Sequence, residues 1–298
     1  MRPLIVIPLP GNEPIAASLA DALGAAEGSV EIRHFPDEEA YVRFASEVGN
    51  EDVALVCSLD RPDGKILPLL FAAETAREFG AARVGLIAPY LSYMRQDRRF
   101  KRGEAVTSRC FARLLSGAFD WLATVDPHLH RLGSLSEVYT VPARAVHAAP
   151  LIGAWIRETV TDPVLVGPDC ESEQWVAAVA RAAGAPHLVL GKVRRGDREV
   201  EVSVPDIERW RDRTPVLVDD IISTGRTMIE TVGQLKRLEM RAAVCIAIHG
   251  IFAGDAYRAL KAEGAAAVVT TNTVPHESNR IDVTEMLAEA VHSLTGGQ

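Results

Sequence analysis

The stretch that decides the fold is Val216-Leu-Val-Asp-Asp-Ile-Ile-Ser-Thr-Gly-Arg-Thr-Met228. It begins with apolar residues, continues with two adjacent carboxylates, and passes through hydroxyl side chains and a glycine. Short apolar runs without polar alternation are typical of strands that are covered on both faces of a parallel sheet. The stretch therefore predicts a buried strand, a loop and the start of a helix, which is the repeating unit of an α/β fold.

The same pattern recurs along the chain on both sides of this stretch. We expect strands at Leu4–Pro8, Val53–Ser58, Val84–Ala88, Trp121–Val125, Val164–Val166, His187–Val193, Val216–Val218, Ala243–Ile248 and Ala267–Thr270. We expect helices at Pro14–Leu23, Ile66–Phe79, Ser108–Ser116, Ser172–Ala183, Thr227–Leu238 and Ala256–Ala262. This alternation predicts parallel sheets with right-handed crossovers, whose ligands lie beyond the carboxyl ends of the strands.

The length of 298 residues allows two domains of ordinary size. The segment Tyr139-Thr-Val-Pro-Ala143 is typical of a crossing between domains, so we expect domains at 1–143 and 144–298. Charged residues alternate irregularly in Arg33–Phe44, which indicates a projecting hairpin.

Composition excludes several classes of protein. Apolar residues make up 48% and charged residues 24%, which is typical of a globular chain rather than a disordered one. No apolar run reaches the ~18–20 residues of a membrane span, and we expect no membrane association. The net charge of −8 argues against unspecific nucleic-acid binding. Four scattered cysteines without a CxxC pair favour a reducing, cytoplasmic location.

The loop after the Val216 strand has the chemistry of a sugar-phosphate site. Hydroxyls and backbone amides at a helix N-terminus favour a phosphate. The residues that offer them are Ser223, Thr224, Gly225 and Thr227. Asp219 and Asp220 can accept hydrogen bonds from vicinal ribose hydroxyls. The alternative is a simple helix cap with two ordinary loop carboxylates.

A second group of charges follows the Val84 strand, in Pro89-Tyr-Leu-Ser-Tyr-Met-Arg-Gln-Asp-Arg-Arg99. Its basic residues are Arg95, Arg98 and Arg99, with Lys101 and Arg102 next. Such a cluster in an acidic protein favours polyphosphate binding. The alternative is a solvated charged loop.

Both stretches resemble known motifs. The Asp219–Thr227 segment resembles the phosphoribosyl diphosphate (PRPP) loop that phosphoribosyltransferases and ribose-phosphate pyrophosphokinases share, with Arg226 where the synthetase version commonly has glycine. Arg226 can add a charge-assisted phosphate contact. The other stretch resembles the pyrophosphokinase motif PYxxYxRQDR, which implies that Arg95 and Gln96 contact ATP.

Three further segments match the same family in order. His34-Phe-Pro-Asp-Glu-Glu39 resembles its FxDGE loop, which implies that Phe35, Asp37 and Glu39 clamp adenine from a neighbouring subunit. Glu38 replaces the glycine of that loop. Thr124-Val-Asp-Pro-His128 and Gly167-Pro-Asp169 resemble segments at a divalent metal, so the resemblance implies Mg²⁺ near His128 and Asp169.

The segment Gly191–Arg198 carries the Lys-x-Arg of the family's mobile catalytic loop, which implies catalytic roles for Lys192 and Arg194. The alternative is an exposed hairpin whose basic residues aid solubility. The family's regulatory loop is basic, whereas Ser46–Asp52 is acidic here, so we expect weak control by phosphate and ADP.

The resemblance implies two similar phosphoribosyltransferase-like α/β domains, each with a central parallel sheet flanked by helices. It implies an ATP side in the first domain, a ribose 5-phosphate side in the second, and a last helix near Val283–Leu294 that packs on the first. The implied reaction is diphosphoryl transfer from MgATP to the C1 hydroxyl of ribose 5-phosphate, in a homo-oligomer that is a dimer or larger. Two alternatives are a phosphoribosyltransferase that consumes PRPP and a catalytically silent paralogue.

Overall fold

The protein, in a computed structural model, forms two compact units. Residues 2–129, 131–167, 172–195, 199–203 and 207–296 are described. The first unit comprises Met1–Val146, Thr273–Pro275 and Val283–Gln298. The second unit comprises His147–Asn272 and His276–Asp282. The C-terminal end of the chain therefore belongs to the first unit.

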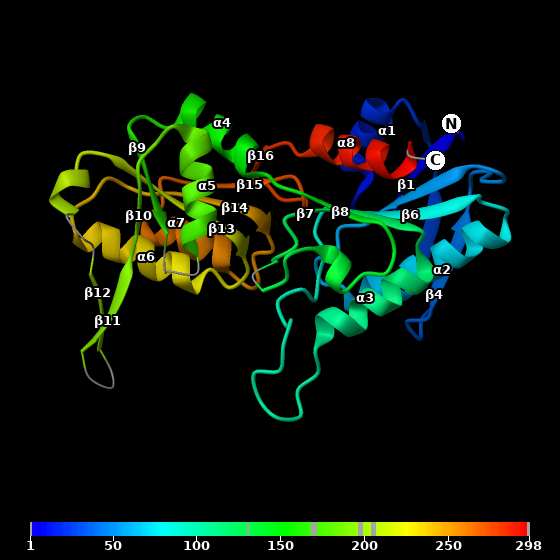
Figure 1. The fold of residues 1–298 in the computed structure, drawn as a ribbon, viewed down its shortest axis with the longest axis horizontal. Coiled ribbons are helices and arrows are strands. Elements are labelled where there is room, and N and C mark those ends of the chain that lie inside the picture. The colour runs from blue at the N-terminus through cyan, green and yellow to red at the C-terminus, as the bar shows by residue number, and fades with distance from the viewer. Residues whose placement is uncertain (1, 130, 168–171, 196–198, 204–206, 297–298) are drawn as a thin grey trace. The chain divides into compact units, whose positions relative to one another are not determined.

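The first unit is a six-stranded sheet in which every pair of neighbouring strands is parallel. Its order is β2 (Ala26–Glu27), β1 (Leu4–Pro8), β5 (Asp52–Val56), β6 (Arg83–Ala88), β7 (Trp121–Val125) and β8 (Ala143–Val146). Helices α1 (Glu13–Leu23) and α8 (Thr284–Thr295) cover one face, and α2 (Asp63–Glu78) and α3 (Thr107–Ala118) cover the other (Figure 1).

The apolar runs of the sequence form the core of this sheet. Every residue of β5 and of β7 is buried. The Trp121 indole packs directly on Gly85, where an added Cβ would lie 1.9 Å from Cε2 of the ring. Burial on both faces explains why these strands lack polar alternation.

The second unit repeats this architecture. Its six-stranded sheet runs β10 (His187–Val189), β9 (Pro163–Gly167), β13 (Thr214–Ile222), β14 (Val244–Gly250), β15 (Ala267–Thr271) and β16 (Asn279–Ile281). All neighbouring strands are again parallel. Helices α4 (Ala149–Thr159) and α5 (Glu173–Ala183) cover one face, and α6 (Arg226–Arg237) and α7 (Ala256–Glu263) cover the other (Figure 1). The expected α/β fold with two parallel sheets is confirmed.

Each unit carries an antiparallel hairpin between its second and third sheet strands in chain order. In the first unit β3 (Val30–His34) pairs with β4 (Ala40–Phe44), which confirms the hairpin expected in this region. In the second unit β11 (Gly191–Arg195) pairs with β12 (Glu199–Ser203), and the pair extends away from the main sheet (Figure 1).

The expectation of one strand over His187–Val193 was wrong. Strand β10 ends at Val189, the Leu190 amide still donates to the Gly167 carbonyl at 2.9 Å, and β11 then begins a separate sheet. The charged residues from Lys192 onward cannot be buried between two layers of helices, so the chain leaves the sheet there.

Several short elements were not expected. They are β2, β8, β12, β16 and helix α4. The strands are two to five residues long, too short for a period to be read. Helix α4 carries Pro150 and Gly153, and an added Cβ at Gly153 would lie 2.4 Å from the Ala182 Cβ of α5. This glycine lets the two helices pack closely, which the sequence alone does not show.

Candidate active site

The two carboxylates of the deciding stretch lie within strand β13. The expected strand Val216–Val218 was too short, because pairing with β14 continues through Asp219↔Ala247 and Ile221↔His249 to Ile222↔Gly250. Both carboxylates are half-buried. The Asp220 amide donates to Oδ1 of Asp219 at 2.9 Å. The acids are therefore fixed by the sheet rather than carried on a mobile loop.

A tight turn joins this strand to α6. Gly225 is the residue before the helix and has φ 67°, a left-handed conformation that favours glycine. No side chain caps the helix, so its first amides face the turn together with the partial positive charge of the helix dipole. Thr224, Arg226 and Thr227 are exposed there, and Ser223 is half-buried. The arrangement is suited to an anion next to a pair of carboxylates.

The hairpin of the second unit carries the two basic residues that the resemblance implies are catalytic. Lys192 pairs with Val202 and Arg194 with Val200, across the two strands β11 and β12. Both residues are two positions apart on one strand, as the Lys-x-Arg spacing predicts.

The arginine-rich segment of the first unit lies between β6 and α3. Arg95 is exposed and Gln96 is half-buried, with the Gln96 carbonyl accepting from the Ser108 amide at 3.3 Å. The nearby Asp97 carboxylate pairs with Arg131, with Nη1 at 3.0 Å from Oδ1. This ion pair anchors the segment to Arg131. The motif alone does not show that Asp97 has this structural role.

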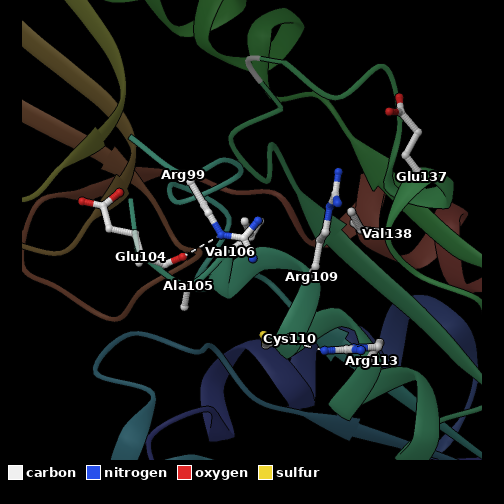
Figure 2. A pocket seen from close by; sticks show the side chains of 10 residues that line it. Arg99, Glu104, Ala105, Val106, Arg109, Cys110, Arg113, Glu137 and Val138 are labelled. Atoms are coloured by element: carbon white, nitrogen blue, oxygen red, sulfur yellow. Dashed lines mark hydrogen bonds between the residues drawn. The ribbon is translucent and has the colours of Figure 1, made fainter. Parts of the chain in front are cut away.

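A pocket of about 710 Å³ opens beside the same segment. Figure 2 shows Arg99, Arg109 and Arg113 around it, with Arg99 bonded to the Glu104 carbonyl at 2.9 Å. The side chain of Glu104 is itself held by the amides of Phe100 and Lys101 at 2.8 and 2.9 Å. Of the basic residues in the sequence motif, only Arg99 lines this pocket; Arg95 and Gln96 do not.

The segment after β7 forms a strained turn at the residues expected near a metal. Asp126 has φ 33° and His128 has φ 54°, and the His128 amide donates to the Asp126 carbonyl at 2.8 Å. Asp126 is buried, and the sequence reasoning did not single it out. Asp169 lies outside the described residues. Within the described ranges, no three His, Cys, Asp or Glu side chains form a group that could hold a metal ion.

The tip of the β3–β4 hairpin carries Phe35, Asp37 and Glu39, all exposed. The Phe35 amide donates to the Glu39 carbonyl at 2.8 Å, and Glu38 has φ 70°. Glu38 therefore adopts the left-handed conformation that a glycine would take without strain.

Arg33 is a further residue at this tip that sequence reasoning missed. Its guanidinium carbon lies 4.8 Å from the Phe35 ring centroid and 4.0 Å from that of Tyr41. The only sequence signal was an arginine two positions before an aromatic residue on a strand.

Comparisons with known proteins match both units of the chain. A family model described as the N-terminal domain of ribose phosphate pyrophosphokinase matches residues 4–118, and the phosphoribosyl transferase domain matches 134–285. The chain is 35% identical to the ribose-phosphate pyrophosphokinase of Methanopyrus kandleri, over 98% of this chain and 100% of the relative. It is 34% identical to that of Methanothermobacter thermautotrophicus, over 96% and 99%.

A solved structure is similar over the whole chain. The crystal structure of phosphoribosylpyrophosphate synthetase from Mycobacterium smegmatis superposes with a TM-score of 0.86, at 25% identity and with 100% of both chains covered. Fold and site thus define a protein made of two phosphoribosyltransferase-type α/β units. The chain belongs to the ribose-phosphate pyrophosphokinase family. No described helix is both long and apolar enough to span a bilayer.

Proposed function

We propose that the protein transfers the diphosphoryl group of MgATP to ribose 5-phosphate and releases PRPP and AMP. The observation that carries the proposal is the strand–turn–helix of Asp219–Thr227, which we call the ribose-phosphate loop. It places two sheet-anchored carboxylates next to an uncapped helix N-terminus. A phosphorylated sugar with adjacent hydroxyls matches this pair of groups.

Within this loop the roles divide by chemistry. Asp219 and Asp220 accept hydrogen bonds from the ribose hydroxyls. The 5-phosphate is held by hydroxyls and amides of the turn, from Ser223, Thr224, Gly225 and Thr227. Arg226 begins α6 and is exposed, so its guanidinium can reach a phosphate at the helix N-terminus.

The first unit provides the ATP side in this proposal, and the second the ribose 5-phosphate side. Arg95 and Gln96 orient the nucleotide, and the exposed Phe35 ring offers a flat surface to adenine, with Asp37 and Glu39 beside it. Support comes from the hairpin, where Arg33 stacks on Phe35 and restricts its ring. A purine stacked on such a preorganised ring loses less entropy on binding.

Mg²⁺ is the proposed metal, near His128 and Asp169. Mg²⁺ is usually held by one or two carboxylates, substrate phosphates and waters rather than by a full protein cage. The turn after β7 carries Asp126 and His128, a carboxylate and an imidazole, which supports a site with few protein ligands. When bound, the ion neutralises charge on the phosphates.

The chemical step needs positioning rather than a covalent intermediate. The C1 hydroxyl oxygen attacks the β-phosphorus and loses its proton, while the bond from the β-phosphorus to the α,β-bridging oxygen breaks and AMP leaves. Lys192 and Arg194 stabilise the charge that develops on the transferring group. No side chain is assigned as the base.

The proposal extends to assembly and location. Phe35 acts on the active site of a neighbouring subunit, so the protein is a homo-oligomer, a dimer or larger. Its location is cytoplasmic, which agrees with the free cysteines Cys57, Cys110 and Cys245. No nucleic acid or membrane partner is part of the proposal.

Phosphorus NMR of the protein with ribose 5-phosphate, ATP and Mg²⁺ tests this function. We expect PRPP and AMP to appear together. ADP in place of AMP would mean γ-phosphoryl transfer and would overturn the mechanism. No turnover, combined with consumption of PRPP in the presence of nucleobases, would support a phosphoribosyltransferase instead.

A further inference from the structure

The backbone of the ribose-phosphate loop accepts hydrogen bonds from Ile251–Ala253, a segment that belongs to none of the motifs described above. The amides of Ile251 and Phe252 both donate to the carbonyl of Ile222, each at 3.0 Å. The amide of Ala253 donates to the carbonyl of Ser223, also at 3.0 Å. Ile222 follows the two carboxylates, and Ser223 begins the phosphate-binding turn. These three bonds therefore fix the backbone between the two halves of the sugar-phosphate site.

The donor segment is itself strained. Phe252 has φ 43°, a left-handed conformation that bulky residues rarely adopt. Such a conformation is unfavourable and persists only where the surrounding structure imposes it. Phe252 is 7% exposed, so the packing of its buried ring helps to hold this backbone together with its amide bond to Ile222.

Two other rings hold Phe252 in place. Its ring centroid lies 4.4 Å from that of His276 and 5.3 Å from that of Tyr257. The Tyr257 and His276 centroids are 4.7 Å apart. We call these three side chains the ring cluster. Aromatic pairs at such distances stabilise each other beyond the burial of their surfaces.

Gly250 provides the space for the ring. An added Cβ there would lie 2.6 Å from Cε2 of Phe252 and 2.9 Å from Cγ2 of Thr270. Gly250 ends β14 and pairs with Ile222 across the sheet. The Phe252 ring therefore packs against the backbone of Gly250. Gly250 pairs with Ile222, whose carbonyl also accepts the hydrogen bond from the Phe252 amide.

A polar network fixes the far side of the cluster. The Ser278 amide donates to Nδ1 of His276 at 3.1 Å, and Oγ of Ser278 lies 2.7 Å from Oγ1 of Thr270. A backbone amide can only donate, so Nδ1 is an acceptor and the neutral imidazole carries its proton on Nε2. His276 is thus oriented by residues around β15 and β16.

We propose that Phe252 is a positioning residue for ribose 5-phosphate: its ring, wedged between Gly250, Tyr257 and His276, sets the amides that hold the ribose-phosphate loop. Phe252 touches no substrate and acts through the carbonyls of Ile222 and Ser223. The inference rests on the proposed function and assigns affinity for the sugar phosphate to a residue outside the motifs. ATP affinity is not affected, because the residues proposed for ATP belong to the first unit.

The test compares Phe252→Leu with Leu235→Ala, a matched control. Leu235 is buried in the same unit near the C-terminal end of α6, away from the helix N-terminus at the proposed phosphate site. Both variants lose core packing and lower the melting temperature. We expect only Phe252→Leu to raise the KM for ribose 5-phosphate about tenfold, equivalent to 1.4 kcal/mol, with the KM for ATP within about twofold of wild type.

Two measurements keep the test independent of folding and of the chemical step. His276→Ala removes a half-exposed ring of the cluster and is expected to show the same selective change, at a smaller size. Calorimetric binding of ribose 5-phosphate, with Mg²⁺ and a non-transferable ATP analogue, is expected to weaken by the same factor as the KM rises.

Three outcomes overturn the inference. Equal changes in the KM for ribose 5-phosphate in Phe252→Leu and Leu235→Ala would mean that the effect comes from loss of overall stability rather than from positioning of the loop. An unchanged KM for ribose 5-phosphate in Phe252→Leu, with wild type active, would reject the positioning role alone. A wild-type protein that neither binds ribose 5-phosphate nor forms PRPP would reject the proposed function, and the inference with it.

Discussion

At the scale of single residues, the folded structure gives cysteines different exposure and therefore different reactivity. Cys57 and Cys245 are fully buried, whereas Cys110 is exposed beside the Figure 2 pocket. Burial raises the pKa of both the Cys57 and Cys245 thiols to about 12. The lysine Lys65 partly opposes this effect at Cys57, but burial is the larger cause.

Thiol labelling near pH 8 checks this difference. We expect Cys110 to react rapidly in the native protein, because the reagent reaches it. Cys57 and Cys245 are expected to react only after unfolding, since both their burial and their raised pKa suppress the thiolate. Peptide mass mapping identifies the labelled residue, and Cys110→Ser is the control. Native labelling of Cys245 would contradict its burial in β14.

Arg226 is the residue at which the loop departs from the family pattern. Because it starts α6 at the proposed phosphate site, we expect Arg226→Ala to raise the KM for ribose 5-phosphate about fivefold to tenfold, by loss of a charge-assisted bond. Arg258→Ala, at an 89% exposed side chain of α7, is the matched control. Equal effects of the two variants would assign the change to net charge alone.

At the scale of elements, the two hairpins are set apart from the main sheets. The β11–β12 pair is a separate two-stranded sheet, as is β3–β4. The β3–β4 hairpin still contributes Phe44 to the core of the first unit, while its tip carries the exposed residues Phe35, Asp37 and Glu39. The ribose-phosphate loop is different, because β13 extends to Ile222 and fixes its carboxylates in the sheet.

Lys192→Ala separates catalysis from folding. We expect kcat to fall about 10²–10³-fold, as when one electrostatic donor to a transition state is lost. The melting temperature is expected to stay close to that of wild type, because β11 lies outside the main sheet. Lys236→Ala, at an exposed lysine of α6, is the control. An unchanged kcat in Lys192→Ala would remove this residue from the mechanism.

At the scale of the whole molecule, the chain uses one architecture twice. The two sheets have the same strand order relative to the chain, and each unit inserts its hairpin at the corresponding place. The corresponding hairpins carry the residues proposed for adenine in one unit and for catalysis in the other. The C-terminal helix α8 packs against α1, β7 and β8, so the first unit is completed by the end of the chain.

Subunit complementation tests the proposed assembly. If Phe35 serves a neighbouring active site, Phe35→Ala and Lys192→Ala are each impaired alone, but hetero-oligomers of the two regain activity. The regained site combines Lys192 of one subunit with Phe35 of the other. Co-expression followed by activity measurement checks this, with each variant expressed alone as the control. Activity no greater than the sum of the two variants would place Phe35 in its own subunit's site.

Control by phosphate and ADP is expected to be weak. The Ser46–Asp52 segment carries Glu47, Glu51 and Asp52, and the Asp52 carboxylate is already paired with Arg83. An acidic surface repels a phosphate. Initial rates at saturating substrate concentrations, measured with and without phosphate, are expected to differ by less than about twofold. The ionic strength is kept constant because salt screens surface charges. Strong activation by phosphate would overturn this prediction.

The sequence alone determined the fold class and the order of the main elements. Unbroken apolar runs such as Trp121–Val125 identify strands covered on both faces, and the Gly225 turn marks the start of α6, because these are local consequences of burial and backbone conformation. The resemblance of these motifs, in the order in which the family has them, identified the family, which the comparisons confirmed.

Only the tertiary structure decided the rest. The end of β13 depends on its pairing with β14, and the departure of β11 from the main sheet depends on its pairing with β12. The Phe252 ring cluster is the clearest case, because Gly250, Tyr257 and His276 carry no joint signal in sequence. They meet only when β14, α7 and the segment before β16 are folded together, since ring packing and hydrogen bonding depend on distance in space rather than on spacing along the chain.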